Sequence, residues 1–562
     1  MIMTLRNSFI ECNGRERAIA LLGEESYREL LGPFDGFESP HLEPQGIVPQ
    51  SDDGVIIAKG DLHGHSAVII SLEGAFQGGG IGEVSGAKIA GALEMVLKDN
   101  EAGVRTYPII IFDTGGVRLQ EANYGLLSIA EIGSAIIALR PHVPVVGIVP
   151  GKIGAYGGMS ITAGLCDAII MTREGRLSMN GPEVIEQEAG IQEFDSKDRQ
   201  HIWATSGGEQ RVASGFADII AEDDVEAMRE AIVSIIEGEV KVSPKSSEVD
   251  RFLSLLQSVD PSKPLSSIDA RELWLQSNED NLDERHALPE TENVSSTGRG
   301  TTWFNLLAKG SEDVGVFPSV RCADALINDR RVRYIAVVPD SANRFPRARN
   351  GEVGLLEGWT IAKHVRDAIE EDQHGAKRTI IAIVDVPSQA FGYREELLGI
   401  HQSCAGAVDA YASARLAGHP VIAFIPGNAI SGAFLSHGLQ ANRLLALNDE
   451  GVLVHVMSKQ SAARITQRSI EELEKATEKV PSMSYDIESF EKLGALHELI
   501  SGVNADAPKD KDRQIIYDKI TEAITDIESN PRDLSSRLTS QIAQDGGRVA
   551  SILVRKKLTE QW

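Results

Sequence analysis

The sequence has few of the residues that mark several common classes of protein. Its four cysteines stand far apart and form no C-x-x-C pair, which argues against a zinc ribbon or a disulfide framework. These cysteines are Cys12, Cys166, Cys322 and Cys404. Aromatic residues make up only 5%, too few for a platform that stacks single-stranded nucleic acid.

Long hydrophobic runs are also missing. No uninterrupted apolar run reaches the roughly 18 to 20 residues that span a bilayer. The opening "MIMTLRNSFIECNGRERAIALL" becomes charged too early for a signal peptide. We therefore expect a cytoplasmic protein that does not enter a membrane.

Positive charge is scarce as well. The chain carries 55 Lys and Arg residues against 82 Asp and Glu residues, a formal net charge of -27. Such an acidic surface repels nucleic acid and anionic membranes, so neither is an expected partner. At 562 residues the chain is too long for one hydrophobic core, and at least two domains are expected.

What the sequence does have is a strand–helix alternation. "GVIIAKGDLHGHSAVIISLEGAF" predicts two short strands around a glycine-rich turn, and "GAKIAGALEMVLKDN" predicts a helix. "YPIIIF", "VPVVGIV" and "DAIIMT" follow as continuous apolar strands, with helical segments between them. This order predicts a parallel sheet covered on both faces. Residues 5–32 are expected to be helical, and the charged tail from Asp506 is expected to form helices outside the core.

The pattern occurs twice. "RTIIAIVDVPSQAFGYREE" repeats "YPIIIFDTGGVRLQE", and "GHPVIAFIPGNAISGAFLSHG" repeats "HVPVVGIVPGKIGAYGGMSITAG". Asp113 precedes Pro150 by nearly the same interval as Asp385 precedes Pro426. Two copies of one fold explain this better than chance. We expect domains at 1–285 and 301–562, joined by a polar linker at 286–300.

The glycine loops carry the clearest chemical signal. Neither the G-x-x-x-x-G-K-[ST] phosphate loop nor a G-x-G-x-x-G fingerprint is present there, which disfavours a nucleotide site. Gly157 and Gly158 stand at the first turn of a predicted helix, where backbone N–H groups have no intrahelical partner. Such donors suit an oxygen that gains negative charge during a reaction. Gly432 and Ala433 stand at the equivalent turn of the second copy, within one residue.

Conventional catalytic motifs are missing from the sequence. It contains no G-x-S-x-G elbow, no H-E-x-x-H motif and no clustered His/Cys/Asp set for a metal. The expected chemistry is therefore one that backbone donors carry with the help of few side chains.

Several stretches resemble a known family. "FDTGGVRLQEANYGLLSIAEIGSA" and "GAYGGMSITAGLCDAII" resemble the β subunit of the carboxyltransferase of bacterial acetyl-CoA carboxylase, and "VDVPSQAFGYREE" resembles its α subunit. The four-cysteine zinc ribbon of that β subunit is missing here. "LLGPFDGFESPHLEPQGIVPQSDDGV", "EGAFQGGGIGEVSGAKIAGALE" and "RFPRARNGEVGL" are more similar to the β and γ subunits of biotin-independent malonate decarboxylase, fused in one chain.

The resemblance implies an α/β protein of two pseudo-duplicated crotonase-like ββα-superhelix domains. It also implies a reaction: a malonyl thioester on the CoA-like phosphopantetheine-type arm of an acyl-carrier subunit loses carbon dioxide and becomes an acetyl thioester. The implied partners are the carrier and acyltransferase subunits, with a homo-oligomer possible. No tightly bound cofactor, biotin or metal is implied.

The resemblance also suggests roles for individual residues. Gly157 and Gly158 would hold the thioester oxygen, and Gly432 and Ala433 would face the departing carboxylate. His437 is a candidate proton donor, although a hydrogen-bonded structural histidine is an equally good interpretation. The candidates for substrate or arm binding are Gly115, Gly116, Arg118, Tyr156, Ser160, Asn428, Arg344, Arg347 and Arg349. For Arg118 the alternative is an ion pair with Glu121, and for the three arginines of 344–349 it is a carrier-binding or merely solvated surface.

Three other functions stay open on the sequence alone. The nearest is the carboxyltransferase component of a biotin-dependent acyl-CoA carboxylase. A crotonase-type hydratase is disfavoured because no second catalytic carboxylate is evident near the glycine pair. A non-catalytic scaffold that docks a carrier protein is the third.

Overall fold

A computed structural model of the chain describes residues 7–277, 297–466, 469–477 and 480–562. Its first half is built on a sheet whose described strands run in the order β1 to β7. Strands β1 to β3 pair antiparallel, and β3 to β7 pair parallel. The elements are α1 (Gly14–Leu22), β1 (Arg28–Leu30), β2 (Val55–Leu62), β3 (His65–Leu72), α2 (Glu83–Glu101), β4 (Tyr107–Ile111), α3 (Ala122–Leu139), β5 (Val146–Val149), α4 (Gly158–Leu165), β6 (Ala168–Met171), α5 (Pro182–Ala189), α6 (Arg199–Ser206), α7 (Gly208–Ala213), β7 (Ile219–Ile220), α8 (Val225–Ile236), α9 (Val249–Ser258) and α10 (Ser267–Ser277).

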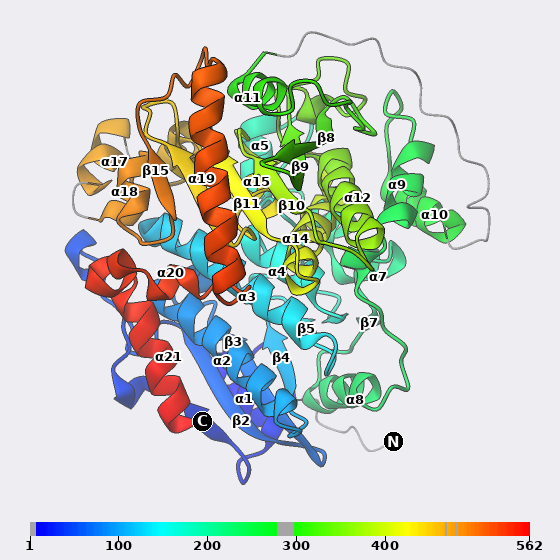
Figure 1. Cartoon of the computed structure of the whole chain (residues 1–562). Coiled ribbons are helices and arrows are strands. Elements are labelled where there is room, and N and C mark those ends of the chain that lie inside the picture. Colours follow the sequence, from blue (N-terminus) through cyan, green and yellow to red (C-terminus); the bar gives the residue numbers. More distant parts are fainter. Residues whose placement is uncertain (1–6, 278–296, 467–468, 478–479) are drawn as a thin grey trace.

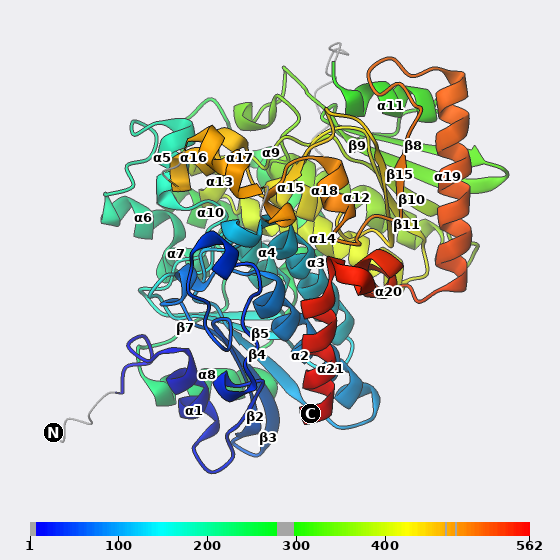
Figure 2. The same cartoon turned by 90° about the vertical axis from the view of Figure 1, so that its left-hand side faces the viewer.

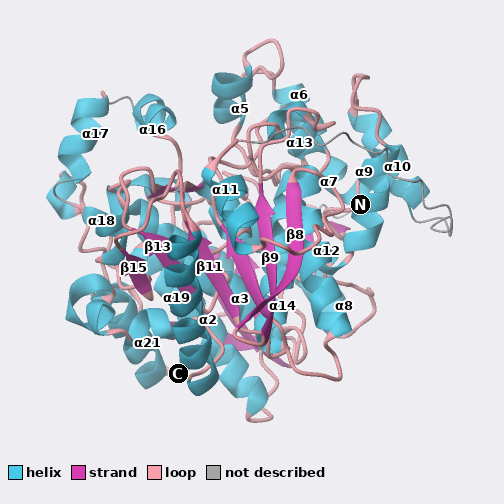
Figure 3. Ribbon diagram, turned by 45° about the horizontal axis from the view of Figure 1, so that its top comes forward, coloured by secondary structure: helices cyan, strands magenta, loops and turns pink. Residues whose placement is uncertain are grey.

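The second half repeats this plan. Its described sheet runs β8–β9–β10–β11–β13–β15, again with an antiparallel hairpin followed by parallel strands (Figure 3). The elements are α11 (Arg299–Leu307), β8 (Val320–Ile327), β9 (Arg330–Val337), α12 (Leu355–Glu371), β10 (Thr379–Ile383), α13 (Tyr393–Leu397), α14 (Ile400–Leu416), β11 (Val421–Ile425), β12 (Ala429–Ile430), α15 (Ser431–Ser436), β13 (Arg443–Leu447), β14 (Val454–His455), α16 (Lys459–Thr466), α17 (Ile470–Thr477), α18 (Ile487–Glu491), β15 (Glu498–Ile500), α19 (Asp510–Ser529), α20 (Ser536–Thr539) and α21 (Val549–Gln561). The predicted duplicated α/β fold class is confirmed.

Tight helix packing is duplicated along with the topology. A Cβ atom at Gly86 in α2 would lie 2.2 Å from Cβ of Ser128 in α3. A Cβ atom at Gly358 in α12 would lie 2.4 Å from Oγ of Ser403 in α14. In both halves, a glycine thus lets the helix after the hairpin press against the next long helix.

The two halves pack face to face through their central helices. Gln402 of α14 donates from Nε2 to the carbonyl of Gly164 in α4 at 2.9 Å. Gln440 donates from Nε2 to the carbonyl of Ala130 in α3 at 2.8 Å. Both amides are buried, so the interface combines apolar packing with satisfied polar groups.

One described helical segment, Leu119–Leu139, is long and apolar enough to cross a membrane, but 89% of the apolar window is buried inside the protein. It contains α3, which lies at the centre of the interface between the halves (Figure 1). Its apolar character therefore reflects burial on all sides.

Three expectations about elements need correction. Of the described residues in this range, 7–32, only α1 is helical, and Arg28–Leu30 form an edge strand that pairs antiparallel with β2 and buries Leu30. The tail is helical, but α21 buries Val554 and Leu558 against α2 (Figure 2). The predicted linker overlaps α11, which begins at Arg299, and most of it lies outside the described residues.

Candidate functional site

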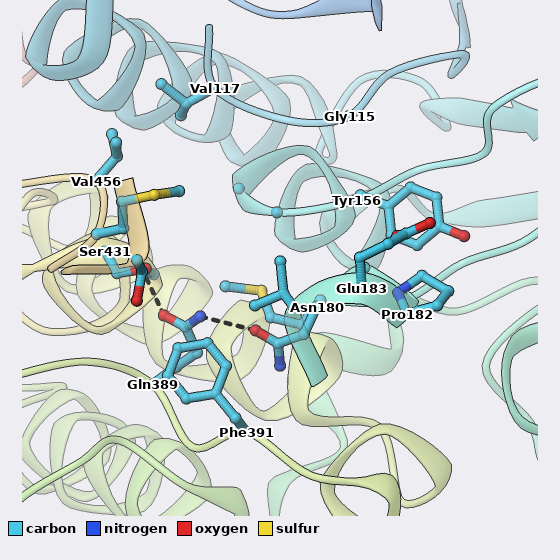
Figure 4. A pocket seen from close by; sticks show the side chains of 18 of the residues that line it. Gly115, Val117, Tyr156, Asn180, Pro182, Glu183, Gln389, Phe391, Ser431 and Val456 are labelled. Atoms are coloured by element: carbon cyan, nitrogen blue, oxygen red, sulfur yellow. Dashed lines mark hydrogen bonds between the residues drawn. The ribbon is translucent and has the colours of Figure 1, made fainter. Parts of the chain in front are cut away.

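The loops at the carboxyl ends of the parallel strands meet in one cavity of about 1000 Å³ (Figure 4). The first half contributes the loops after β4 and β5, and the second half contributes those after β10 and β11. Gly158 and Gly432 both line this cavity. Ligands bind at this edge in parallel α/β sheets, and here two such edges enclose the same space.

In the first half, one of the two predicted glycine donors is occupied. Gly157 has a φ of +55° and donates its N–H to the carbonyl of Met179 at 2.9 Å. The prediction for Gly157 is therefore wrong: its role is to adopt the left-handed conformation that starts α4. Gly158 is the first residue of α4, and its N–H has no acceptor in the part of the chain that the structure describes.

A second donor in the same loop pair is Val117, which the sequence interpretation missed. Val117 lines the cavity, and among the described residues its N–H has no acceptor. The loops of the two donors touch, since a Cβ atom at Gly116 would lie 3.1 Å from Cα of Gly157. Two adjacent backbone N–H groups, from a strand-end loop and a helix start, are what an oxyanion requires. Its position in the sequence could have indicated this role, because Val117 directly follows the glycine pair that ends a predicted strand.

Gly115 and Gly116 themselves serve the loop. Gly115 donates its N–H to the carbonyl of Gly78 at 2.8 Å, and Gly116 donates to Oγ1 of Thr114 at 3.0 Å. Gly115 lines the cavity. Gly116 has a φ of +103°, and a Cβ atom there would lie 2.9 Å from the carbonyl oxygen of Tyr156. These glycines let the loop after β4 pack closely against the loop after β5. Their own N–H groups are occupied, so the donor that this loop offers to a ligand is Val117.

In the second half, the equivalent turn is shifted by one residue from the prediction. The bridge between Val386 and Ala429 repeats that between Thr114 and Ala155, so Ser431 corresponds to Gly157. Ser431 also has a positive φ, of +65°.

Gly432 therefore matches Gly158, and Ala433 is a fully buried helix residue that is not part of the cavity lining. The predicted role of Ala433 is wrong. Gly432 does line the cavity, but its N–H donates to Oε1 of Gln389 at 3.0 Å.

Gln389 belongs to a buried polar chain that joins the halves (Figure 4). Its Nε2 donates to Oδ1 of Asn180 at 2.9 Å, and Nδ2 of Asn180 donates to Glu396 at 2.8 Å. Burial raises the pKa of Glu396, opposed by Arg211 and by donors that include the backbone N–H groups of Asn180 and Met179.

His437 is not placed to donate a proton to a ligand. It is fully buried and is not part of the cavity lining. Nδ1 lies 3.0 Å from the hydroxyl of Tyr411, and Nε2 lies 3.0 Å from the carbonyl of Ile383. Burial lowers its pKa to about 4, so it is neutral at pH 7. The structural interpretation of His437 is the correct one.

Arg118 is also structural. Its Nη1 lies 2.6 Å from Asp53 and 2.7 Å from Glu121, and all three side chains are buried. Charges this deep persist because they are paired. The phosphate-binding prediction for Arg118 is wrong, and its open alternative, the ion pair with Glu121, is confirmed.

Three further candidates differ in their placement. Tyr156 lines the cavity with its ring, while its hydroxyl is buried and has no partner among the described residues. The hydroxyl of Ser160 donates to the carbonyl of Gly157 at 2.7 Å, which fixes the start of α4. Asn428 is not part of the cavity lining and donates its N–H to Asp385 at 3.0 Å. Ser160 and Asn428 thus shape loops.

The arginines at 344, 347 and 349 do not line the cavity. Arg344 donates to the carbonyl of Val259, and Arg347 forms an ion pair with Glu193. Arg349 donates from Nε to a carbonyl of its own loop at 3.0 Å. Arg344 and Arg347 thus connect the two halves outside the cavity lining.

A different basic group lines the cavity and was missed. It consists of Lys152, Arg176 and Arg199, and none of them forms an ion pair with another described residue. The guanidinium carbons of Arg176 and Arg199 lie 4.8 and 4.9 Å from the ring centre of Trp203. Carboxylates also line this wall, Glu183 beside Tyr156 among them (Figure 4).

The duplicated fold and the paired backbone donors define a crotonase-like protein whose site suits a carbonyl oxygen that gains charge. Residues 348–562 match the family model described as malonate decarboxylase gamma subunit. The chain is 35% identical to the malonyl-S-ACP:biotin-protein carboxyltransferase MADC of Malonomonas rubra, over 49% of this chain and 90% of the relative. It is 39% identical to MADD of the same organism, over 34% and 68%.

Among solved structures, a malonate decarboxylase hetero-tetramer from Pseudomonas in complex with malonate is 50% identical. The match covers 48% of this chain and 98% of that one, with a TM-score of 0.47. The chain belongs to the family of malonate decarboxylase and malonyl-S-ACP carboxyltransferase subunits.

Proposed function

We propose that this chain decarboxylates a malonyl thioester carried on an acyl-carrier subunit, giving the acetyl thioester and carbon dioxide. The observation that carries the proposal is a pair of N–H donors, Val117 and Gly158, that have no acceptor among the described residues and lie in a cavity that both halves enclose. Family membership supports the malonyl substrate.

The reaction needs little more than these donors. When the bond between C2 and the carboxyl carbon breaks, its electron pair moves through C2 onto the thioester oxygen, and carbon dioxide leaves. Donors already fixed at that oxygen stabilise the enolate more than the uncharged thioester, which lowers the barrier. A proton then adds to C2 to form the acetyl group.

The basic group at Lys152, Arg176 and Arg199 is proposed to hold the phosphates of the CoA-like arm. It lines the same cavity as Gly158, so an arm that enters past it can deliver the thioester to the donors. A solved Pseudomonas malonate decarboxylase in complex with coenzyme A, 52% identical to this chain, is in keeping with an arm of this chemistry. We further propose carrier and acyltransferase subunits as partners, and the cytoplasm as the location.

The second candidate function is carboxyl transfer to biotin, which the names of both Malonomonas relatives favour. One assay distinguishes decarboxylation from carboxyl transfer to biotin. Purified chain is incubated with malonyl-CoA or malonyl-carrier in the presence of excess avidin, and acetyl thioester is followed by mass spectrometry. Decarboxylation predicts undiminished product, whereas loss of product with avidin identifies biotin as the carboxyl acceptor.

The donor itself is tested by Gly158→Pro. Proline lacks an N–H but is tolerated at the first position of a helix, which is where Gly158 stands. We expect kcat to fall by about 10²- to 10³-fold relative to Gly158→Ala, because one oxyanion donor is worth that much.

Gly158→Ala is the matched control because it keeps the N–H and adds the same Cβ. That atom would meet only the mobile ends of Ile129 and Leu435, at 2.7 and 2.9 Å. Equal rates for the two variants would rule out Gly158 as a donor.

A further inference from the structure

A side-chain amide closes the backbone donor of the second half. Gly432 is the repeat-related counterpart of Gly158, yet its N–H is taken by Oε1 of Gln389 at 3.0 Å. Gln389 lines the cavity and is almost fully buried. Its own counterpart is Val117, since Val353 bridges to Gln389 as Ile81 bridges to Val117. A valine side chain has no acceptor, so the first half leaves its donor open.

The orientation of the Gln389 amide is dictated by its neighbours. Oε1 of Glu396 accepts from the backbone N–H of Asn180 at 2.6 Å and from its Nδ2 at 2.8 Å, so Asn180 turns its NH₂ towards Glu396 and its Oδ1 towards Gln389. Gln389 must then turn its NH₂ to Asn180 and its oxygen to Gly432. Asn180 comes from the first half of the chain and Glu396 from the second, so residues of both halves hold the Gln389 amide against the N–H of Gly432.

Met179 also packs against Gly432. A Cβ atom at Gly432 would lie 2.0 Å from Cε of Met179 and 3.2 Å from Oε1 of Gln389. A thioether and an amide of the protein thus both pack against this glycine. A ligand oxygen gains the Gly432 N–H only if Gln389 leaves.

The occupied N–H of Gly432 bears on what happens to the carboxyl group. Once the bond to C2 breaks, carbon dioxide can depart, or a ureido nitrogen such as that of biotin can attack it. In the second case a new N–C bond forms and the ureido N–H proton passes to C2. That nitrogen becomes nucleophilic as negative charge builds on the ureido oxygen, which therefore requires a hydrogen-bond donor of its own.

We propose that Gln389 determines the fate of the carboxyl group. By occupying the Gly432 N–H, it denies a ureido oxygen its donor, so the carboxyl group leaves as free carbon dioxide. Gln389 acts as a specificity-determining residue, with Asn180 and Glu396 as its positioning residues. This inference rests on the proposed function and explains how a member of a family with biotin-protein carboxyltransferases can decarboxylate without biotin.

The test follows where the carboxyl carbon goes. Malonyl-CoA labelled in its free carboxyl group is incubated with full-length chain and millimolar free biotin, and label is counted as carbon dioxide and as carboxybiotin. We expect wild type to give carbon dioxide. Gln389→Ala should raise the carboxybiotin fraction by about tenfold or more, because it frees a donor of the kind that oxyanion holes use. Calorimetry should show biotin binding that wild type lacks.

Gln389→Leu is the matched control. It also removes the acceptor but keeps the space filled, so its label distribution should stay that of wild type. The inference is overturned if wild type diverts as much label as Gln389→Ala, or if folded Gln389→Ala diverts no more than Gln389→Leu. If wild type releases carbon dioxide with avidin present, the proposed function holds whatever the Gln389 variants show. If wild type needs biotin, both the proposed function and the inference about Gln389 are overturned.

Discussion

At the residue scale, the two halves give the same backbone turn different occupants. The N–H of Gly158 has no acceptor in the described parts of the chain, while the N–H of Gly432 is bonded to Gln389. The backbone dictates where a donor stands, but one side chain decides whether a ligand reaches it. Duplication of the fold has therefore not produced two equal sites.

Tyr156 makes a prediction about stability at this scale. Its hydroxyl is buried without a partner among the described residues, and burial raises its pKa to about 12. Removing an unpaired buried hydroxyl relieves a desolvation cost, so Tyr156→Phe should leave the unfolding free energy unchanged or raise it by up to about 1 kcal/mol. Urea denaturation measures this.

Tyr411→Phe is the matched control for that measurement. The hydroxyl of Tyr411 is buried but lies 3.0 Å from Nδ1 of His437, so its loss should cost about 1 kcal/mol. An equal loss in both variants would show that the hydroxyl of Tyr156 has a stabilising partner.

Arg199 tests the proposed contact with the arm. Arg199→Glu places a negative charge in the cavity wall, and we expect KM for malonyl-CoA to rise about tenfold with a smaller effect on kcat. The difference should shrink as salt is added. Arg173→Glu changes the net charge equally, but Arg173 is not part of the cavity lining, so its KM should stay near wild type. Similar KM values for both variants would remove Arg199 from the arm-binding group.

At the scale of elements, the C-terminal helix α21 fastens the second half to the first. Arg548, just before it, lies 2.7 Å from Glu131 of α3, and Arg555 lies 2.8 Å from the same carboxylate. Burial raises the pKa of Glu131, but the two arginines outweigh it and the net shift is downward. A buried carboxylate thus depends on a helix far away in the sequence.

Removing one arginine should therefore destabilise the protein. Arg548→Met keeps most of the side-chain volume but leaves Glu131 underpaired, and we expect a loss of about 2–3 kcal/mol in unfolding free energy. The double variant Glu131→Gln/Arg548→Met should recover much of it, since no uncompensated charge remains. An additive loss in the double variant would contradict this account.

At the scale of the whole molecule, buried histidines make the folded state less stable in acid. Burial lowers the pKa of His364, His437 and His455 to about 4 each. In the unfolded chain these groups titrate near their ordinary pKa of about 6.5. Between these values each of these histidines binds a proton more readily in the unfolded chain, so its contribution to stability falls as pH decreases from about 6.5 to about 4.

Each of these histidines should contribute about 3 kcal/mol to that loss. Buried carboxyl groups act in the opposite direction, since burial raises the pKa of Asp167 to about 6 and that of Glu395 to about 7. The histidine contribution is therefore measured by comparing variants with wild type in urea at pH 7.5, 6 and 5. Relative to wild type, His437→Gln should gain stability as pH falls, whereas His374→Gln, at an exposed position, should not. An equal pH dependence of the urea midpoint in His437→Gln and wild type would contradict the prediction.

The class of fold and the approximate place of the site can be predicted from the amino-acid sequence. Continuous apolar strands, repeated glycine turns and family motifs are local signals, and they placed β4, β5, β10 and β11 and the turn at Gly158 correctly. It also determined the duplication, because strand-end aspartates and Pro-Gly pairs recur at a near-constant interval.

Which groups are free to act depends on contacts formed in the folded protein. His437 and Arg118 look like catalytic residues until their partners Tyr411 and Asp53, 26 and 65 residues away, are seen. Val117 looks ordinary until its loop meets that of Gly157. A pattern specifies where a donor or charge stands along the chain, but its hydrogen bonds depend on what packs against it, and those neighbours come from other elements of the fold.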